Sequence, residues 1–230
     1  MTTPRARARE QTLRDITRIG REQLVAAGPE SLSLRAVARE LGVVSSAVYR
    51  YVRSRDELLT LLVVDAYTEL GDSVDAAIAD VDGARAQFFA LGHTVRAWAL
   101  REPSRYALLF GTPVPGYHAP GEQTTDPGTR VVVALLRVLE RAHAAGALAS
   151  GGDVDPALAE DLRAIADEFR VDLPESALAR GALAWASLFG VVSFELFGQY
   201  GAGGFPHREA LFDHHLAVLA DTVGLAGVPV

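Results

Sequence analysis

The sequence contains no cysteine, and this absence excludes every function that depends on a thiol. A disulfide framework, a cysteine-ligated zinc or iron–sulfur site and a thiol nucleophile all need that residue. A chain without cysteine fits a reducing compartment, so we expect a cytoplasmic protein.

Long apolar runs are also missing. The most hydrophobic stretch, between Arg180 and Glu195, holds 14 uncharged residues, whereas a membrane-spanning helix needs roughly 20. Residues 1–9 are rich in arginine and lack the apolar run of a secretory signal. We therefore expect no membrane partner, and we interpret residues 181–194 as a buried or interface helix.

Apolar residues are nevertheless plentiful, at 49% of a 230-residue chain. This content excludes disorder of the whole chain and allows one large domain or two small ones. Charge is unevenly spread: residues 1–56 carry 11 arginines and 6 acids, net +5, while residues 57–230 carry 11 arginines and 23 acids, net −12. Clustered cations bind phosphates, so the first 56 residues are predicted to have a polyanionic partner, with a solvated helical face as the alternative.

Apolar residues recur at helical spacing along most of the chain, and no segment alternates convincingly as a strand does. The predicted fold class is therefore all-α. Residues 111–128 interrupt the pattern with four prolines and four glycines, and a loop of that length is usually functional or mobile. Capping residues, glycines and prolines delimit helices over residues 13–27, 34–41, 45–53, 55–79, 84–101, 104–110, 127–146, 155–170, 174–198 and 206–224.

Two of these helices, 34–41 and 45–53, are joined by a tight turn at Gly42. Ser33 and Ser45 stand where N-caps are needed, and Ser54 to Glu57 predicts a capping box for the next helix. Two short helices around a glycine turn, the second opening with hydroxyl residues, indicate a helix-turn-helix, whose second helix enters the major groove of DNA. Helical hairpins are common in all-α proteins, so the residue types have to decide.

The run LSLRAVARELGVVSSAVYRYVRSRDELL, residues 32–59, resembles the DNA-binding domain of the tetracycline-repressor (TetR) family. The resemblance rests on Ala38 and Gly42-Val43 in the turn, on Tyr49, and on the Arg55-Asp-Glu-Leu-Leu59 helix opening. At three positions, Val44, Arg50 and Val52, the sequence departs from residues common in the family. These departures leave the operator sequence open.

The resemblance implies two domains. Residues 1–56 would form an N-terminal three-helix helix-turn-helix domain with a basic arm, and residues 57–230 a larger helical ligand-binding and dimerisation domain. The arm, with Arg5, Arg7 and Arg9, would either add minor-groove or phosphate contacts or be a solvated tail.

The resemblance also assigns contacts to double-stranded DNA. Arg50 is the candidate for a bidentate contact to guanine, with a phosphate contact as the alternative. Tyr49 and Tyr51 would bind the backbone, although we expect one of the two to pack between helices. The implied DNA-binding residues are Ser33, Arg35, Ser45, Ser46, Ala47, Tyr49, Arg50, Tyr51 and Arg55.

Residues 84–198, with Arg96-Ala-Trp98 and the run from Glu102 to Tyr117, resemble one subtype of TetR-family ligand domain, the WHG type. An unidentified small hydrophobic effector is implied. Such a site is lined by aromatic and aliphatic groups with few polar ones, although each candidate is also suited to ordinary core, including His93. The candidate lining residues are Phe88, Phe89, His93, Trp98, Tyr106, Phe110, Trp185 and Phe189.

Residues 178–198 are apolar on nearly every face, so this helix must be covered on all sides. Together with the apolar stripe of 206–224 it predicts a four-helix homodimer interface, as in the family. A two-fold dimer would bind a pseudo-palindromic operator with half-sites about 34 Å apart.

The expected function is a sequence-specific DNA-binding transcriptional regulator, a repressor that a small effector releases by displacing helix 55–79. A ligand-independent regulator and an activator are the alternatives. An enzyme is not expected, since no nucleophile–base pair is evident. His207, His214 and His215 do not form a metal-ligand pattern, because adjacent helical positions face different directions, and we expect no metal and no cofactor.

Overall fold

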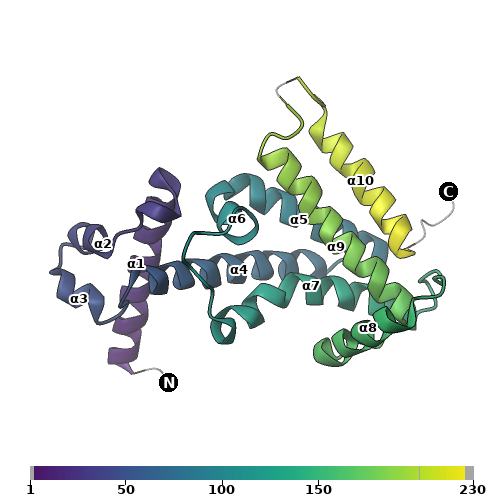
Figure 1. Ribbon diagram of the computed structural model, residues 1–230, viewed down its shortest axis with the longest axis horizontal. Coiled ribbons are helices and arrows are strands. Elements are labelled where there is room, and N and C mark those ends of the chain that lie inside the picture. Colours follow the sequence, from purple (N-terminus) through teal and green to yellow (C-terminus); the bar gives the residue numbers. More distant parts are fainter. Residues whose placement is uncertain (1–2, 202, 226–230) are drawn as a thin grey trace. The chain divides into compact units, whose positions relative to one another are not determined.

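The computed structural model describes residues 3–201 and 203–225, and within them it is helical without a named strand (Figure 1). The predicted all-α class is confirmed. The elements are α1 (Pro4–Ala27), η1 (Pro29–Ser31), α2 (Leu34–Glu40), α3 (Ser45–Tyr49), α4 (Arg55–Ala79), α5 (Ala84–Arg101), α6 (Pro103–Phe110), α7 (Gly121–Ala144), α8 (Pro156–Phe169), α9 (Glu175–Leu196) and α10 (Arg208–Val223).

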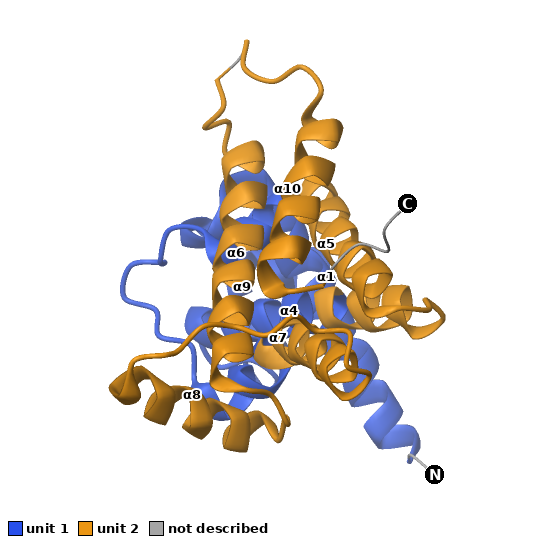
Figure 2. Cartoon of the chain, turned by 90° about the vertical axis from the view of Figure 1, so that its right-hand side faces the viewer, with its two compact units in different colours: residues 1–69, 102–128 blue, residues 70–101, 129–230 orange. Residues whose placement is uncertain are grey.

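The chain divides into two compact units (Figure 2). Unit 1 comprises Met1–Glu69 and Glu102–Gly128, and unit 2 comprises Leu70–Arg101 and Thr129–Val230. The chain passes between the units within α4, between α5 and α6, and within α7. The division into residues 1–56 and 57–230 that we expect from the sequence is a division by function, and it stays a prediction.

The core of unit 1 is built from the apolar faces of α1 to α4. Ile16 and Ile19 from α1, Val37 from α2, Val48 from α3 and Leu58 from α4 are each at most 1% exposed and belong to one cluster. Burial of side chains of this size typically contributes about 1.5–3 kcal/mol each. Because four helices contribute to one cluster, none of the short helices has to be stable alone.

Helix α1 begins at Pro4, nine residues before the first helix that the sequence predicts. The Thr3 hydroxyl accepts a hydrogen bond from the Ala6 amide at 3.2 Å, and Pro4 occupies the first helical turn. The arginine-rich segment is therefore an ordered helix and not an unstructured tail, although its arginines are exposed to solvent. Its residues carry no apolar stripe because they are exposed, so periodicity did not reveal the helix.

Helix α7 begins at Gly121, not at residue 127 as predicted, so the connecting loop covers residues 111–120. The sequence interpretation placed Pro127 at the helix start, where proline is favoured. The helix instead continues across Pro127 and loses one backbone hydrogen bond there. Part of the shortened loop belongs to the core of unit 1, because Val114 is only 9% exposed in the same cluster.

A buried arginine ties α6 to α4. Arg105 is 1% exposed, and its guanidinium donates to Glu69 Oε2 at 2.6 Å and to Asp65 Oδ2 at 3.0 Å. Asp65 also accepts from Arg21 of α1 at 2.6 Å. This network connects three helices of unit 1 through charges that have been removed from water, so its geometry must be satisfied for the unit to fold.

In unit 2, α9 packs against α10, α8 and α5. Arg96 of α5 donates two hydrogen bonds of 2.7 Å to the carboxylate of Glu195 on α9, and the Arg96 guanidinium lies 5.2 Å from the ring centroid of Phe212 on α10. By length and composition α9 is the one helix among the described residues that is apolar enough to cross a membrane. Its buried face and the Glu195 ion pair agree with the prediction of a buried or interface helix.

Removal of one partner from the Arg96–Glu195 pair is expected to destabilise unit 2. Because Glu195 is 8% exposed, Glu195→Ala would leave Arg96 without its bidentate partner, and we expect the free energy of unfolding to fall by about 2–4 kcal/mol. Urea denaturation followed by circular dichroism measures this loss. Glu168→Ala, at an exposed position on α8, is the control. Equal midpoints for the two variants would contradict the assignment.

Candidate DNA-binding surface and effector region

The α2–turn–α3 segment has the geometry of a helix-turn-helix. Ser33 caps α2 as predicted, since its hydroxyl accepts from the Ala36 amide at 3.3 Å. Gly42 has φ +67°, a left-handed conformation in which glycine is preferred. The Val43 amide then donates to the Ala38 carbonyl at 3.0 Å, which closes the turn.

Helix α3 offers one face to the core and the other to solvent. Val48 is buried, whereas Ser46, Tyr49 and Arg50 are exposed, and Ser45 and Ala47 are partly exposed. The predicted N-cap at Ser45 is wrong: Val44 is the N-cap residue and no side chain caps α3. Since the Ser45 hydroxyl is not used for capping, it remains available to an external partner.

The two tyrosines differ as expected. Tyr51 is half-buried and packs against the unit 1 core, whereas Tyr49 is 42% exposed. Arg35 is exposed at the start of α2. Arg55 is engaged inside the unit, because it donates to the Pro29 carbonyl at 3.0 Å and lies 3.6 Å from Asp56, so a phosphate contact by this side chain would compete with both bonds.

Pairing separates the 11 arginines of residues 1–56 into two groups. Four have partners within unit 1: Arg14 bonds Gln11, Arg18 pairs with Glu22, Arg21 with Asp65, and Arg55 is engaged as described. The other seven make no ion pair or hydrogen bond through their guanidinium groups within the described part of the chain; they are Arg5, Arg7, Arg9, Arg35, Arg39, Arg50 and Arg53. The positive charge of the module is therefore concentrated on side chains that are free to meet an anion.

Two features of this surface were missed by sequence reasoning. Val44 is 71% exposed at the start of α3, where an apolar side chain is suited to a thymine methyl group. Val114 and Tyr117 attach the 111–120 loop to the helix-turn-helix, and the Tyr117 hydroxyl lies 3.0 Å from the hydroxyl of Thr60 in α4. The sequence shows Val44 only as a departure from the family, and no local pattern predicts a contact between Thr60 and Tyr117, which are 57 residues apart.

Burial explains the state of the Tyr117 hydroxyl. It raises the pKa of Tyr117 above the usual value, although the hydrogen bond with Thr60 acts in the opposite direction. An ordinary tyrosine is already neutral at physiological pH, so the raised pKa extends this neutral range further upward.

The eight predicted effector residues are divided between the units. Tyr106 and Phe110 lie in unit 1 with ring centroids 5.0 Å apart, and the other six lie in unit 2. In unit 2 the structure brings together Trp185 with Phe189, at 4.3 Å, and Phe89 with His93, at 6.3 Å. Phe88 and Trp98 are 1% exposed and serve as core of unit 2.

His93 lies on the surface of unit 2. Its side chain is 44% exposed, and its Nε2 lies 3.3 Å from Asp213 of α10. It also makes an edge contact with Phe212, with centroids 5.7 Å apart. His93 is therefore not the core histidine expected as the alternative, because it is exposed, although its imidazole does have partners.

Helices α9 and α10 expose several large apolar side chains to solvent. Leu183 is 53% and Phe194 52% exposed on α9, and Val218 is 49% exposed on α10. The two helices lie side by side in unit 2 (Figure 2). Among the described residues no group of three His, Asp or Glu side chains is arranged to hold a metal ion, and this includes His207, His214 and His215.

Comparison with known proteins covers both parts of the chain. The family model described as bacterial regulatory proteins of the tetR family matches residues 16–62, and the model described as tetracyclin repressor-like, C-terminal domain matches residues 88–219. The chain is 45% identical over 221 residues to the HTH-type transcriptional regulators Rv1816 of Mycobacterium tuberculosis and Mb1846 of Mycobacterium bovis, over 93% of this chain and 94% of each relative.

Solved structures of similar fold include regulatory proteins. SCO4313, described as a regulatory protein, superimposes with a TM-score of 0.78 at 38% identity, over 95% of this chain and 100% of that one. FadR of Bacillus subtilis, solved in complex with stearoyl-CoA, has a TM-score of 0.64 at 11% identity, over 93% of this chain and 99% of that one. The second likeness concerns the fold alone.

Loss of the Val114 side chain is expected to loosen the helix-turn-helix. Val114→Ala removes buried methyl groups from the unit 1 core, and we expect a loss of about 1–3 kcal/mol in unfolding free energy. Amide hydrogen exchange of residues 32–62 would rise in this variant. His118→Ala, an exposed position in the same loop, is the control. Unchanged exchange in residues 32–62 would mean that the loop does not support the motif.

Proposed function

Because the chain belongs to the TetR family of helix-turn-helix transcriptional regulators, we propose that it is a repressor which a small hydrophobic effector releases from a pseudo-palindromic operator. The observation that carries the proposal is the exposed α3 face beside seven arginines without acidic partners. Base contacts specify the sequence, and phosphate contacts position the protein on the duplex. We place the regulator in the cytoplasm, where bacterial DNA is accessible.

The proposed base-reading residues are those at the exposed start of α3: Ser45, Ser46 and Ala47, with Val44 added from its exposure. Arg50 is at the C-cap of α3 and carries a free guanidinium, which suits a bidentate contact to guanine. Tyr49 and Arg35 are exposed and suit phosphate contacts, while Ser33 is already used as an N-cap.

A homodimer is proposed because α9 and α10 pack together and expose apolar side chains, Leu183 and Phe194 on α9 and Val218 on α10. Exposed apolar side chains grouped on one face of a helix pair are typical of an oligomer interface. A two-fold dimer would present two α3 helices to successive major grooves, about 34 Å apart. The acidic excess of residues 57–230 keeps that part of the chain away from phosphates.

Effector coupling is proposed to use two routes into unit 1. The first is α4, which continues from unit 1 into unit 2. The second is α6 with the 111–120 loop, held to α4 by Arg105 and by the Tyr117–Thr60 hydrogen bond. A ligand that moves α5 or α7 would shift α6 and the loop, since α6 directly follows α5 and the loop directly precedes α7. An effector needs a preference of about 1–3 kcal/mol for the released state to lower operator affinity measurably.

The effector class is proposed from the residues available for lining a site. Within unit 2, Phe89, Trp185 and Phe189 supply aromatic surface, and His93 supplies a polar group. FadR, which shares the fold, is known in complex with stearoyl-CoA, and this supports the idea that such a helical body can enclose a long apolar chain. A small apolar ligand with one polar end is the proposed class.

Selection of bound duplexes from a random DNA pool tests the proposed function. We expect enrichment of an inverted repeat, and we expect Arg50→Ala to blur one position of each half-site, at a cost of about 1–3 kcal/mol for that base. Arg163→Ala, on an exposed arginine of α8, is the control that changes the same charge elsewhere. If no sequence is enriched at low salt by a folded protein, the repressor proposal fails.

Disruption of the α9–α10 face tests the dimer. Leu183→Glu and Val218→Glu each place a charge in the proposed interface, so we expect the mass measured by light scattering to fall to that of a monomer. Operator affinity should then fall about a hundredfold or more, because the two half-sites are no longer linked. Leu100→Glu, on α5 and 42% exposed, is the control. A dimer that survives both substitutions would place the interface elsewhere.

A further inference from the structure

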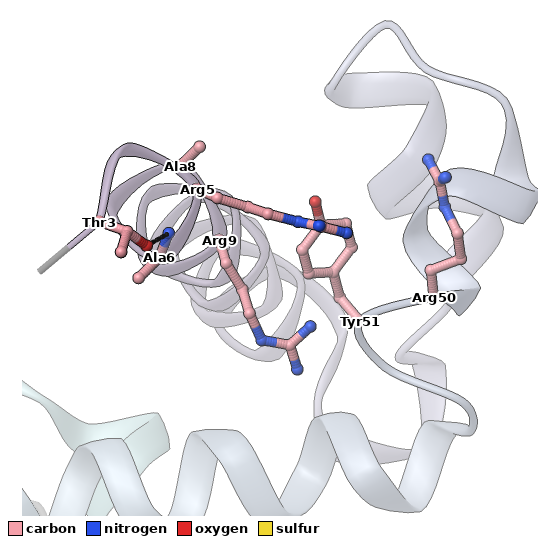
Figure 3. A pocket seen from close by; sticks show the side chains of 7 residues that line it. All are labelled: Thr3, Arg5, Ala6, Ala8, Arg9, Arg50 and Tyr51. Carbon is pink, nitrogen blue, oxygen red and sulfur yellow. Dashed lines mark hydrogen bonds between the residues drawn. The ribbon is translucent and has the colours of Figure 1, made fainter.

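A basic pocket lies between the first turns of α1 and the end of α3. It is open to solvent and has a volume of about 550 Å³. Figure 3 shows the side chains around it. The lining residues are Thr3, Arg5, Ala6, Ala8, Arg9, Arg50 and Tyr51.

The arginines of α1 reach this pocket because of helical spacing. Arg5 and Arg9 are four residues apart, so they project from one face of α1, whereas Arg7 projects from another and does not line the pocket. In Figure 3 Arg5 extends toward Tyr51. The Arg9 guanidinium lies 5.5 Å from the centroid of the Tyr51 ring, and Tyr51 packs against the unit 1 core. The ring therefore gives the exposed Arg9 side chain a fixed support.

The charge of the pocket is not neutralised by the protein. Arg5, Arg9 and Arg50 make no ion pair within the described part of the chain. Farther along α1 the situation is the opposite, since Arg18 pairs with Glu22 and Arg21 with Asp65. Arg5 and Arg9 place two like charges on one face of α1 beside the pocket, whereas the Arg50 side chain is directed away from α1 in Figure 3. An anion bound by Arg5 and Arg9 would relieve the repulsion between them.

The position of the pocket next to α3 indicates which anion it would bind. Arg50 and Tyr51 directly follow α3, the helix that enters the major groove, and phosphodiester groups line both edges of that groove. We propose that the pocket binds one backbone phosphodiester at the edge of the groove, with Arg5 and Arg9 as its ligands and Tyr51 as their support. This assignment rests on the proposed function, and it adds α1 to the DNA-binding surface.

Phosphate binding predicts a specific pattern in the salt dependence of operator binding. We expect Arg5→Ala and Arg9→Ala each to lower affinity about five- to tenfold and to reduce the slope of log K against log salt by about one per subunit, without a change in preferred sequence. Arg7→Ala reports the general charge of the arm alone, and its effect should be clearly smaller. Arg14→Ala, on α1 but bonded to Gln11, should bind as the parent does. Equal losses at Arg5, Arg7 and Arg9 would mean an unspecific basic arm and would overturn the proposal.

A second measurement identifies the phosphate itself. Single methylphosphonate substitutions remove the charge of one phosphate at a time along the operator. At the phosphate held by the pocket, parent and Arg9→Ala should bind the modified duplex equally well, whereas they differ about five- to tenfold elsewhere. If no position abolishes the difference, Arg9 does not contact the backbone. Circular dichroism melting of every variant excludes a folding defect as the cause.

A third measurement distinguishes binding of a DNA phosphodiester from binding of a free phosphate compound. Calorimetric titration of the DNA-free protein with inorganic phosphate should show no binding at micromolar phosphate, because two exposed arginines hold a lone phosphate only weakly. Binding at micromolar phosphate that Arg9→Ala abolishes would make this an effector site and overturn the DNA assignment. The proposed function is tested separately: if the parent enriches no operator it fails, whereas enrichment with unaffected Arg5 and Arg9 variants refutes only the pocket.

Discussion

The apolar cluster of unit 1 is the constraint on which the DNA-binding surface depends. Helix α3 has five residues and α2 has seven, both too short to be stable alone in water. They are held because Val37 and Val48 pack against Ile16 of α1 and Leu58 of α4. The direction of α3, and with it the position of every proposed base contact, is thus decided by side chains that never meet DNA.

The same cluster includes a segment from beyond α5. Val114 enters it from the 111–120 loop, and Arg105 anchors α6 to acids of α4 from inside the unit. A segment that follows α5 in the chain is therefore part of the DNA-binding unit. The proposed regulation through this segment would need no long-range pathway, because a shift in α6 or its loop would change contacts in the core that orients α3.

The arginines of unit 1 fall into two groups, those with acidic partners and those without. Arginines with acidic partners brace helices against one another, as Arg21 and Arg105 do through Asp65. Arginines without such partners gather on α1, α2 and the end of α3. The chain contains arginine but no lysine. Where acids lie within reach arginine joins helices, and where none does it stays exposed and is proposed to bind phosphate.

The sequence by itself determined the all-α class, the helix-turn-helix and most helix bounds, because helical periodicity, Ser33 as a cap and Gly42 as a turn act over a few residues. It did not reveal the helical start of α1, whose exposed arginines leave no apolar pattern, or the helix across Pro127. Only the tertiary structure decided that Val114 joins the core and which arginines remain unpaired. Both depend on segments far apart in the chain that meet only when the core forms, and no local pattern encodes such a meeting.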